Sequence, residues 1–324
     1  MSKFQVIGIG SPIVDILSQV DDAHIDKIRG DKGGMELVES QEMEELLSLL
    51  SSHEQVSGGS AANTIVGLSQ LGFSSTLLGK IGDCEMGKFY RKNLQNSGVD
   101  HARLKVCTES LTGKCLSMIT PDAERTLRTC LGAAGNLSAD EVSVDDFKGV
   151  DHAHIEGYVL FNRELTEKVL DSAKAAGCSI SLDLASFEVV KANEDILDYL
   201  LMKYVDMVFA NEEEATAYCG STDPDKALEK LSRHCATAVV KLGPDGAILA
   251  NGNEKVRVEA QRVTAIDTTG AGDLWAAGFL YGRLSGKDLV SSAQYGARLG
   301  AEVVQIIGAS ISEDRWNDIR KIVK

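Results

Sequence analysis

The sequence predicts an α/β protein built on a doubly wound, mostly parallel sheet, with a small second β-sheet as a lid. From residue 152 onward, short β-rich runs alternate with amphipathic helical runs, which is the rhythm of βαβ units. Two stretches, at about 16–38 and 103–131, interrupt the chain with short alternating runs and turn signals. Near the C-terminal end, Gly270-Ala271-Gly272 precedes a run that is apolar on every face, which indicates a buried helix in a large core.

Composition favours one large core and a small-molecule partner. Of the 324 residues, 44% are apolar and 25% are charged, as in ordinary globular proteins. The 33 Lys and Arg against 48 Asp and Glu give a net charge of −15, which argues against nucleic acid or an anionic membrane as the main partner. No long linker or repeat divides the chain, so we predict a single domain over 1–324 with the lid formed by the two insertions.

Cysteine usage and the N-terminus favour a cytoplasmic location. The seven cysteines are odd in number and none is spaced as CxxC, so neither a disulfide framework nor a zinc site is predicted. The chain enters a β-rich run without the basic and apolar segments of a signal peptide, and no apolar run reaches membrane-spanning length.

The first core strand is predicted at Phe4–Gly10. Two of its glycines match a dinucleotide-binding fingerprint, but the third required position is Ile13, so a nicotinamide-dependent oxidoreductase is not favoured. Asp15 follows this strand, where open α/β sheets place their ligands. Its carboxylate could chelate two neighbouring sugar hydroxyls, or simply cap a turn.

A glycine pair opens the second predicted helix of the N-terminal half, after an amphipathic helix at 41–51. Gly58 and Gly59 could let a ligand approach the backbone, or could form only a turn before a tightly packed small-residue helix. Further on, 82–88 satisfies the first seven positions of a GxxxxGK[ST] phosphate loop. Phe89 lacks the hydroxyl that this motif gives to Mg²⁺, so we set the match aside.

The two interrupting stretches predict a lid. Short strands are expected at 104–107, 115–120 and 126–129, pairing with the excursion at 16–38. A small sheet of this kind can cover the strand ends of the main sheet, exclude water and complete a site on closure.

One further core strand is expected in the N-terminal half, at 75–78, and the C-terminal half alternates regularly between strands and helices. There we expect strands at 152–155, 179–184, 206–210, 238–241 and 247–250, and helices at 164–176, 194–202, 211–219 and 223–233.

Two segments of this half follow strand ends and suit a nucleotide. Asn211 and Glu214 open a helix on one face, where they could hold Mg²⁺ through waters, or could act only as helix caps. After the next strand, Lys241 could oppose a phosphate while Gly243 and Gly246 let a nucleotide lie against the backbone. A plain hairpin turn would account for the same residues.

The strongest candidate for chemistry is the start of the buried helix. Gly270, Ala271 and Gly272 would present free N–H groups at the positive end of this helix, which is a natural anion site. Asp273 lies one residue further, and a carboxylate beside a phosphate site would repel the phosphate. Either it takes a proton from a hydroxyl that attacks a phosphoryl group, or it merely favours the helix dipole.

Taken together, these segments resemble the ribokinase-like, or PfkB, family of carbohydrate and nucleoside kinases over essentially the whole chain. Gly58–Asn63 looks like the first family signature, and Asp267–Asp273 with its helix looks like the second. The Asn-x-x-Glu motif of the family matches Asn211–Glu214, and its Leu-Gly-x-x-Gly motif matches Leu242–Gly246.

The resemblance implies a role for each matching position. Asp273 would be the catalytic base, beside an anion hole formed by the N–H groups of Gly270, Ala271 and Gly272. The acceptor would be held by Asp15, Ser11, Gly58, Gly59, Asn63 and Tyr158. ATP and Mg²⁺ would be held by Asn211, Glu214, Lys241, Gly243, Gly246 and Thr269. Some members of the family bind a monovalent cation such as K⁺, for which the candidates here are Asp267, Thr269, Gly308 and Ser312.

Within the family, the adenosine kinase branch looks nearest. The similar segments are Gly10–Ile16, Arg125–Ala134 and His154–Tyr158. Ser11 stands where that branch usually has Asn, and the lid stretches contain no Phe, Tyr or Trp to stack on a purine, which leaves Tyr158 as the candidate.

The resemblance therefore implies an ATP- and Mg²⁺-dependent kinase acting on a primary hydroxyl of a nucleoside or ribosyl-type sugar. A kinase acting on a free sugar (ribose, fructose or a keto-deoxy sugar acid) is the alternative. A non-catalytic binding protein on the same fold is the rival of another class. The expected state is a monomer or a homodimer joined through the lid.

Overall fold

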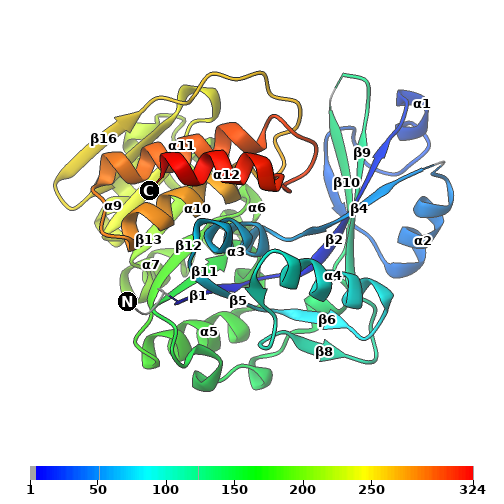
Figure 1. The fold of residues 1–324 in the computed structure, drawn as a ribbon, viewed down its shortest axis with the longest axis horizontal. Helices are drawn as coiled ribbons and strands as arrows, with labels where there is room; N and C mark the ends of the chain where they lie inside the picture. Colours follow the sequence, from blue (N-terminus) through cyan, green and yellow to red (C-terminus); the bar gives the residue numbers. More distant parts are fainter. Residues whose placement is uncertain (1–4, 51, 123, 324) are drawn as a thin grey trace.

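The computed structural model describes residues 5–50, 52–122 and 124–323 and contains one large sheet and one smaller sheet (Figure 1). The large sheet has the strand order β16-β15-β14-β13-β12-β11-β1-β5-β7. Its strands from β7 to β14 are parallel, and β15 and β16 add an antiparallel edge. Their bounds are β1 (Gln5–Ile9), β5 (Ser74–Leu78), β7 (Val99–Asp100), β11 (His152–Glu156), β12 (Ser179–Asp183), β13 (Met207–Ala210), β14 (Thr237–Lys241), β15 (Ala247–Asn251) and β16 (Glu254–Val258).

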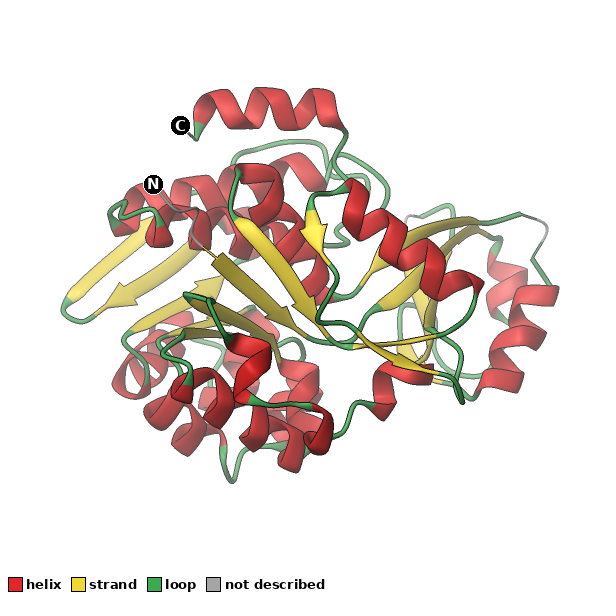
Figure 2. Ribbon diagram, turned by 60° about the horizontal axis from the view of Figure 1, so that its bottom comes forward, coloured by secondary structure: helices red, strands yellow, loops and turns green. Residues whose placement is uncertain are grey.

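Helices cover both faces of the large sheet (Figure 2). Side chains alternate along each strand, so the sheet has a separate apolar core on each face. β11 and β12 contribute apolar side chains to only one of these cores, because their other face carries polar residues such as His152, His154 and Ser181. One core packs against α5 (Arg163–Ala175), α7 (Leu197–Tyr204), α8 (Glu212–Cys219) and α9 (Pro224–His234). The other packs against α3 (Ser60–Leu71), α4 (Glu85–Asn96), α10 (Ala271–Leu284), α11 (Leu289–Val303) and α12 (Glu313–Ile322). The predicted doubly wound α/β fold is confirmed.

The smaller sheet is the lid, and it lies beside the C-terminal strand ends of the large sheet (Figure 1). Its order is β3-β10-β9-β2-β4, with β2 (Ile13–Gln19), β3 (Met35–Leu37), β4 (Glu54–Gly58), β9 (Gly113–Ile119) and β10 (Arg125–Cys130). One face buries Ile16, Leu116 and Met118 under α1 (Asp22–Ile25) and α2 (Ser40–Ser48). The run expected at 104–107 is not in this sheet, because β8 (Lys105–Cys107) pairs with β6 (Lys80–Gly82) in a separate two-stranded sheet.

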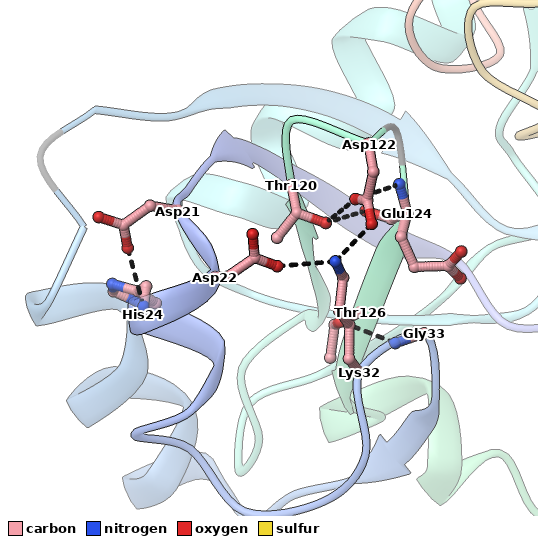
Figure 3. A network of polar contacts seen from close by, with 9 residues as sticks. All are labelled: Asp21, Asp22, His24, Lys32, Gly33, Thr120, Asp122, Glu124 and Thr126. Carbon is pink, nitrogen blue, oxygen red and sulfur yellow. Dashed lines mark hydrogen bonds and ion pairs between the residues drawn. The ribbon is translucent and has the colours of Figure 1, made fainter.

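The tip of the lid is held by polar contacts between segments far apart in the sequence (Figure 3). The Lys32 ammonium lies between two carboxylates, 2.7 Å from Asp22 and 2.5 Å from Asp122. The amide of Gly33 donates to Thr126 Oγ1 at 3.0 Å. These groups are largely exposed, so water and salt screen both ion pairs and each contributes little to stability. Their effect is to fix the excursion after β2 against the turn between β9 and β10.

A buried arginine connects the same segments more strongly. Arg128 of β10 is the largest fully buried side chain among the described residues. Its guanidinium donates to the carbonyl oxygens of Arg29, Gly34 and Leu127, and within the described residues no carboxylate is paired with it. The side chain therefore adds charge-assisted hydrogen bonds to backbone oxygens in a buried region, where the Gly34 oxygen also accepts from the Leu127 amide at 2.9 Å.

We predict that Arg128→Ala lowers the free energy of unfolding by about 2–4 kcal/mol, because it removes buried packing and the charge-assisted hydrogen bonds to these carbonyl groups. Urea unfolding followed by circular dichroism measures the loss, and limited proteolysis should map new cleavage to residues 29–34. Lys32→Ala, at the exposed network, is the control and should shift the urea midpoint far less than Arg128→Ala. Equal losses in the two variants would contradict this assignment.

Candidate active site

The first turns of α3 and α10 meet at the carboxyl group of Asp273. Ser60 Oγ donates to its Oδ1 at 2.8 Å and Asn63 Nδ2 donates to its Oδ2 at 2.9 Å. Thr64 Oγ1, also on α3, donates to the backbone oxygen of Asp273 at 3.1 Å. The two segments that match the family signatures are thus joined by direct hydrogen bonds.

Burial raises the pKa of Asp273 to about 6 from its usual 3.8. The hydrogen bonds from Asn63 and Ser60 oppose this rise, the charge of Asp183 adds to it, and the charge of Lys241 lowers it. A pKa near the working pH allows one carboxyl group both to accept a proton and to release it.

The turn before Asp273 requires glycine. Gly270 has φ 72°, and a β-carbon there would lie 2.6 Å from the Ala309 side chain. The amides of Gly270 and Gly272 have no hydrogen-bond partner in the part of the chain that the structure describes. The amide of Ala271, expected to be free, donates to the Thr268 oxygen at 3.1 Å because the turn closes on itself. Two open amides therefore face outward at the positive end of α10.

Asp15 lies in the lid rather than at the end of the core strand β1, because the chain starts lid strand β2 only two residues after Ser11. A β-carbon at Gly58 of β4 would collide with the Asp15 carboxyl group, so these two residues share one surface. Burial raises the pKa of Asp15 to about 7, Arg125 opposes the rise, and Asp273 and Asp267 add to it. The charge of Asp273 acts on the pKa of Asp15, so the two carboxyl groups belong to one electrostatic cluster.

A lysine ammonium faces the start of α10. Lys241, the last residue of β14, forms an ion pair with Asp183 at 2.8 Å. Its Nζ lies 3.0 Å from the position that a β-carbon on Gly272 would take. Asp183 was not predicted from the sequence, and its only signal there is that it ends a buried strand, β12.

Asn211 and Glu214 form a reciprocal cap at the start of α8. Glu214 accepts from the Asn211 amide at 2.8 Å and from Asn211 Nδ2 at 2.7 Å. Burial raises the pKa of Glu214 to about 7, the charge of Asp183 adds to the rise, and Lys241 opposes it. Among the described residues, no group of three or more His, Cys, Asp or Glu could hold a metal ion by itself. Mg²⁺ in proteins is usually held by one or two carboxylates together with waters and substrate phosphates, so Asn211 and Glu214 would supply only part of its ligands.

Asp267 organises the loop before α10. Its Oδ1 accepts from the amide and Oγ1 of Thr269, at 2.9 and 2.5 Å, and its Oδ2 accepts from the Gly308 amide at 2.8 Å. Burial opposes ionisation, but these hydrogen bonds and Arg125 hold the pKa of Asp267 below its usual value. Arg125 of lid strand β10 approaches Asp267 to 3.5 Å, so this loop also contacts the lid. Ser312 is exposed at the start of α12, with no hydrogen bond to Asp267.

The remaining nucleotide candidates lie in the turn after β14. Gly243 and Gly246 both have positive φ, of 51° and 91°, and a β-carbon at Gly246 would collide with the Val258 oxygen. Glycine is therefore needed for the turn itself, whatever else binds there.

Glu156 is a second site residue that was not predicted. It is fully buried at the end of β11 and accepts from the amides of Ser11 at 2.7 Å and Ala61 at 3.1 Å. Burial raises its pKa, against the effect of these hydrogen bonds. Glu156 thus ties the start of the lid to the start of α3. Tyr158, two residues further, is 37% exposed, and burial and nearby carboxylates raise the pKa of its hydroxyl.

A cavity of about 510 Å³ lies along the lid, within the range of small-molecule pockets. Asp15, Cys115, Thr129 and Leu37 occupy one row across four neighbouring lid strands. At the usual strand spacing, Thr129 lies about 10 Å and Leu37 about 14 Å from Asp15. Thr129 and Leu37 line the cavity together with Leu111 and Leu131. The lining also includes Met43 of α2 and the neighbouring pair Lys114 and Cys130, which lie on the α2 face of the lid sheet, opposite Asp15. The cavity is therefore lined from both faces of the sheet and does not simply extend the surface shared by Asp15 and Gly58.

Comparison with protein families gives one match across most of the chain. A family described as pfkB family carbohydrate kinase matches residues 31–316. Within the described residues, none of the helices has the length and hydrophobicity required to span a bilayer.

Known structures and curated proteins give related kinases. An adenosine kinase from Sinorhizobium meliloti is 32% identical, with a TM-score of 0.90, over 99% of this chain and 100% of that one. A probable sugar kinase from Rhizobium etli is 30% identical, with a TM-score of 0.91, over 99% of both chains. A 5-dehydro-2-deoxygluconokinase from Clostridium perfringens is 29% identical over 79% of this chain and 80% of the relative.

Proposed function

This chain belongs to the pfkB family of carbohydrate kinases, and we propose that it phosphorylates the primary hydroxyl of a nucleoside-type acceptor with ATP as donor. That it is a phosphotransferase acting on a carbohydrate or nucleoside hydroxyl follows from the family. The observation that carries the finer proposal is the position of Asp273, held by two α3 side chains beside the open amides of α10.

The residues present support in-line displacement. The acceptor hydroxyl donates its proton to Asp273 while its oxygen forms a bond to the γ-phosphorus, and the bond from phosphorus to the ADP oxygen breaks. The amides of Gly270 and Gly272 and the Lys241 ammonium face the charge on the transferring group. Asn211 and Glu214 would hold Mg²⁺, which neutralises phosphate charge when bound.

The lid surface around Asp15 supports an acceptor larger than a free sugar. A ribosyl group that hydrogen-bonds to Asp15 near Gly58 and Asn63 leaves the rest of the same row of the sheet uncovered beyond Cys115. A base attached to that sugar would extend along this row, towards Thr129 and the exposed Leu37. Tyr158, which is 37% exposed, is our candidate for contact with the base.

We extend the proposal to the ion, the assembly and the location. A monovalent cation such as K⁺ would sit at the loop of Asp267, Thr269 and Gly308, with Ser312 as a further ligand. The protein would act as a monomer or as a dimer joined through the lid sheet. All seven cysteines are free, which suits the reducing cytoplasm, the location we propose.

A coupled ADP-release assay tests the proposed acceptor. The panel comprises adenosine, other nucleosides, ribose, fructose and a keto-deoxy sugar acid, with a control lacking acceptor. We expect kcat/KM for the best nucleoside to exceed that for ribose by at least about 100-fold, the effect of filling an apolar pocket with a base. Leu37→Asp, which removes the apolar end of the row that Asp15 shares, should abolish most of this preference while ribose turnover persists.

Other results lead to the alternatives. Equal or better turnover of a free sugar would support the second candidate, a sugar kinase, which the absence of aromatic residues from both lid insertions favours. If acceptors bind tightly but none of them leads to ADP release from ATP, the protein is a non-catalytic binding protein and the proposal is overturned.

A further inference from the structure

We propose that Asp183 is a positioning residue that holds the Lys241 ammonium over the first turn of α10, where the transferring phosphoryl group would lie. The inference rests on the proposed function and adds to it a residue that none of the sequence motifs contains. It is carried by the ion pair, by the position of Lys241 relative to Gly272 and by the backbone that fixes Asp183.

The geometry brings two strand ends together across a third. Asp183 ends β12 and Lys241 ends β14, with β13 between them. The lysine side chain must therefore span about two strand spacings, roughly 10 Å between backbones, to reach Asp183. Both side chains are buried, at 7% exposure for Asp183 and 13% for Lys241. Along this path, Nζ comes within 3.0 Å of the space beside Gly272.

An ammonium group does not stay at this place unaided. The first turn of a helix carries partial positive charge, so it repels a cation and favours an anion. A buried cation also needs a partner to replace its water. Asp183 supplies the opposite charge, at 2.8 Å. When a phosphate occupies the open amides of α10, the ammonium is already beside it and needs little reorganisation.

The backbone after β12 fixes the carboxyl group. The Ala185 amide donates to Asp183 Oδ1 at 3.0 Å, which leaves Oδ2 for Lys241. Ala185 has φ 64° and is the only residue other than glycine with positive φ in the described part of the chain. A residue other than glycine is strained in this conformation, and here the strained turn orients Asp183.

If Asp183 is removed, Lys241 can approach another carboxylate, that of Glu214. Among the negative charges that raise the pKa of Lys241, that of Glu214 has the second largest effect, after Asp183. Glu214 lies on α8, which packs on the face of the sheet opposite α10. We therefore expect Asp183→Asn to let Lys241 turn away from Gly272 and towards Glu214.

A double-mutant cycle tests whether Asp183 acts through Lys241. The four proteins are the parent, Asp183→Asn, Lys241→Met and the double variant, each checked by thermal unfolding. We expect kcat to fall about 10- to 100-fold in Asp183→Asn and about 10²- to 10³-fold in Lys241→Met, with acceptor KM unchanged in both. The double variant should be no slower than Lys241→Met, because Asp183 then has no ammonium left to place.

The acid limb of the pH–rate profile adds a second readout. The charged and titratable groups that act electrostatically on Asp273, or on which its charge acts, are Asp183, Lys241, Asp15, Glu156 and Tyr158. Because Lys241 lowers the pKa of Asp273, Lys241→Met should move the acid limb of kcat to higher pH. A merely structural loss would lower kcat equally at all pH values.

Each outcome decides the inference. The inference is overturned if the kcat losses of the two single variants multiply in the double variant, or if Asp183→Asn has the kcat of the parent.

If Asp183→Asn alone fails to fold, Lys241→Met is compared with the double variant, because the double variant buries neither charge. A lower kcat in the double variant than in Lys241→Met would then overturn the inference. If the parent turns over no acceptor, the proposed function fails. The affinity of the four proteins for a non-hydrolysable MgATP analogue is then measured by calorimetry. The inference is supported if each single change lowers this affinity and the double variant binds no more weakly than Lys241→Met. It is overturned if the losses of affinity of the two single variants multiply in the double variant.

Discussion

Asp273→Asn is expected to lose about 10³- to 10⁴-fold in kcat while folding normally and binding both substrates, because it removes the general base and little else. The amide has the size of the carboxyl group. Its oxygen can accept from Asn63, and its NH₂ group can donate to the Ser60 hydroxyl, so the contacts between α3 and α10 survive. Steady-state kinetics gives kcat, and calorimetry with acceptor and with a MgATP analogue gives the two affinities.

The same variant should be more stable than the parent at alkaline pH. The folded-state pKa of Asp273 is about 6, above its usual 3.8, so between these values the folded protein binds more protons than the unfolded chain. Stability contributed by this group is therefore lost as pH rises from about 4 to 6, and burial of the ionised form is a cost above pH 6. Asparagine carries no such cost. We expect a higher Tm for Asp273→Asn at pH 8 and a smaller difference at pH 4, measured by calorimetry; a lower Tm at pH 8 would contradict the assigned burial.

Asp15→Ala should have the second largest effect and should act on the acceptor alone. We expect kcat/KM for the acceptor to fall about 10³-fold, because sugar hydroxyls lose a charged hydrogen-bond acceptor in a buried site, while KM for ATP changes less than about threefold. The pKa of Asp15 is about 7, so in the parent the acceptor KM should rise as pH falls from 8 to 6. In Asp15→Ala this dependence should be absent.

Two glycine-to-alanine substitutions, one beside Asp15 and one far from it in the sequence, supply a matched comparison. Gly58→Ala places a β-carbon against the Asp15 carboxyl group and should raise the acceptor KM without removing the charge. Gly300→Ala in α11 meets Trp275 only at 3.4 Å, an ordinary contact, and should leave both KM values unchanged. An acceptor KM that is the same in Gly58→Ala and Gly300→Ala would contradict the assignment of Asp15 to acceptor binding.

Much of the fold could be predicted from local sequence patterns. The alternation of β-rich and amphipathic runs predicted most strands of the large sheet to within about two residues, because buried parallel strands and helices differ in period. Its two edge strands, β7 and β16, were not predicted. Two further errors came from short elements. The segment 104–107 has strand composition, but pairing with β6 decides which sheet it joins. The short helix α6 (Phe187–Ala192) has no periodic pattern of its own and depends on the Ser186 cap.

The site residues likewise fall into those that a local sequence pattern could identify and those that it could not. Positions in glycine-rich segments could be singled out, because Gly58 and Gly270 are required by close approach and by positive φ. Asp183 and Glu156 were missed, since an acidic residue at the end of a strand has no distinctive local pattern. Their importance depends on partners 58 and 145 residues away along the chain. The position of Asp15 in the lid likewise depends on which strand pairs with β4.

The most direct test of the central claim is a crystal structure with the acceptor identified by the ADP-release assay and a non-hydrolysable MgATP analogue bound together. The account predicts that the acceptor's primary hydroxyl lies within about 3.2 Å of an Asp273 carboxyl oxygen, with the γ-phosphate analogue at the amides of Gly270 and Gly272. An acceptor bound with that hydroxyl beyond hydrogen-bond reach of Asp273, or a γ-phosphate placed away from α10, would contradict it.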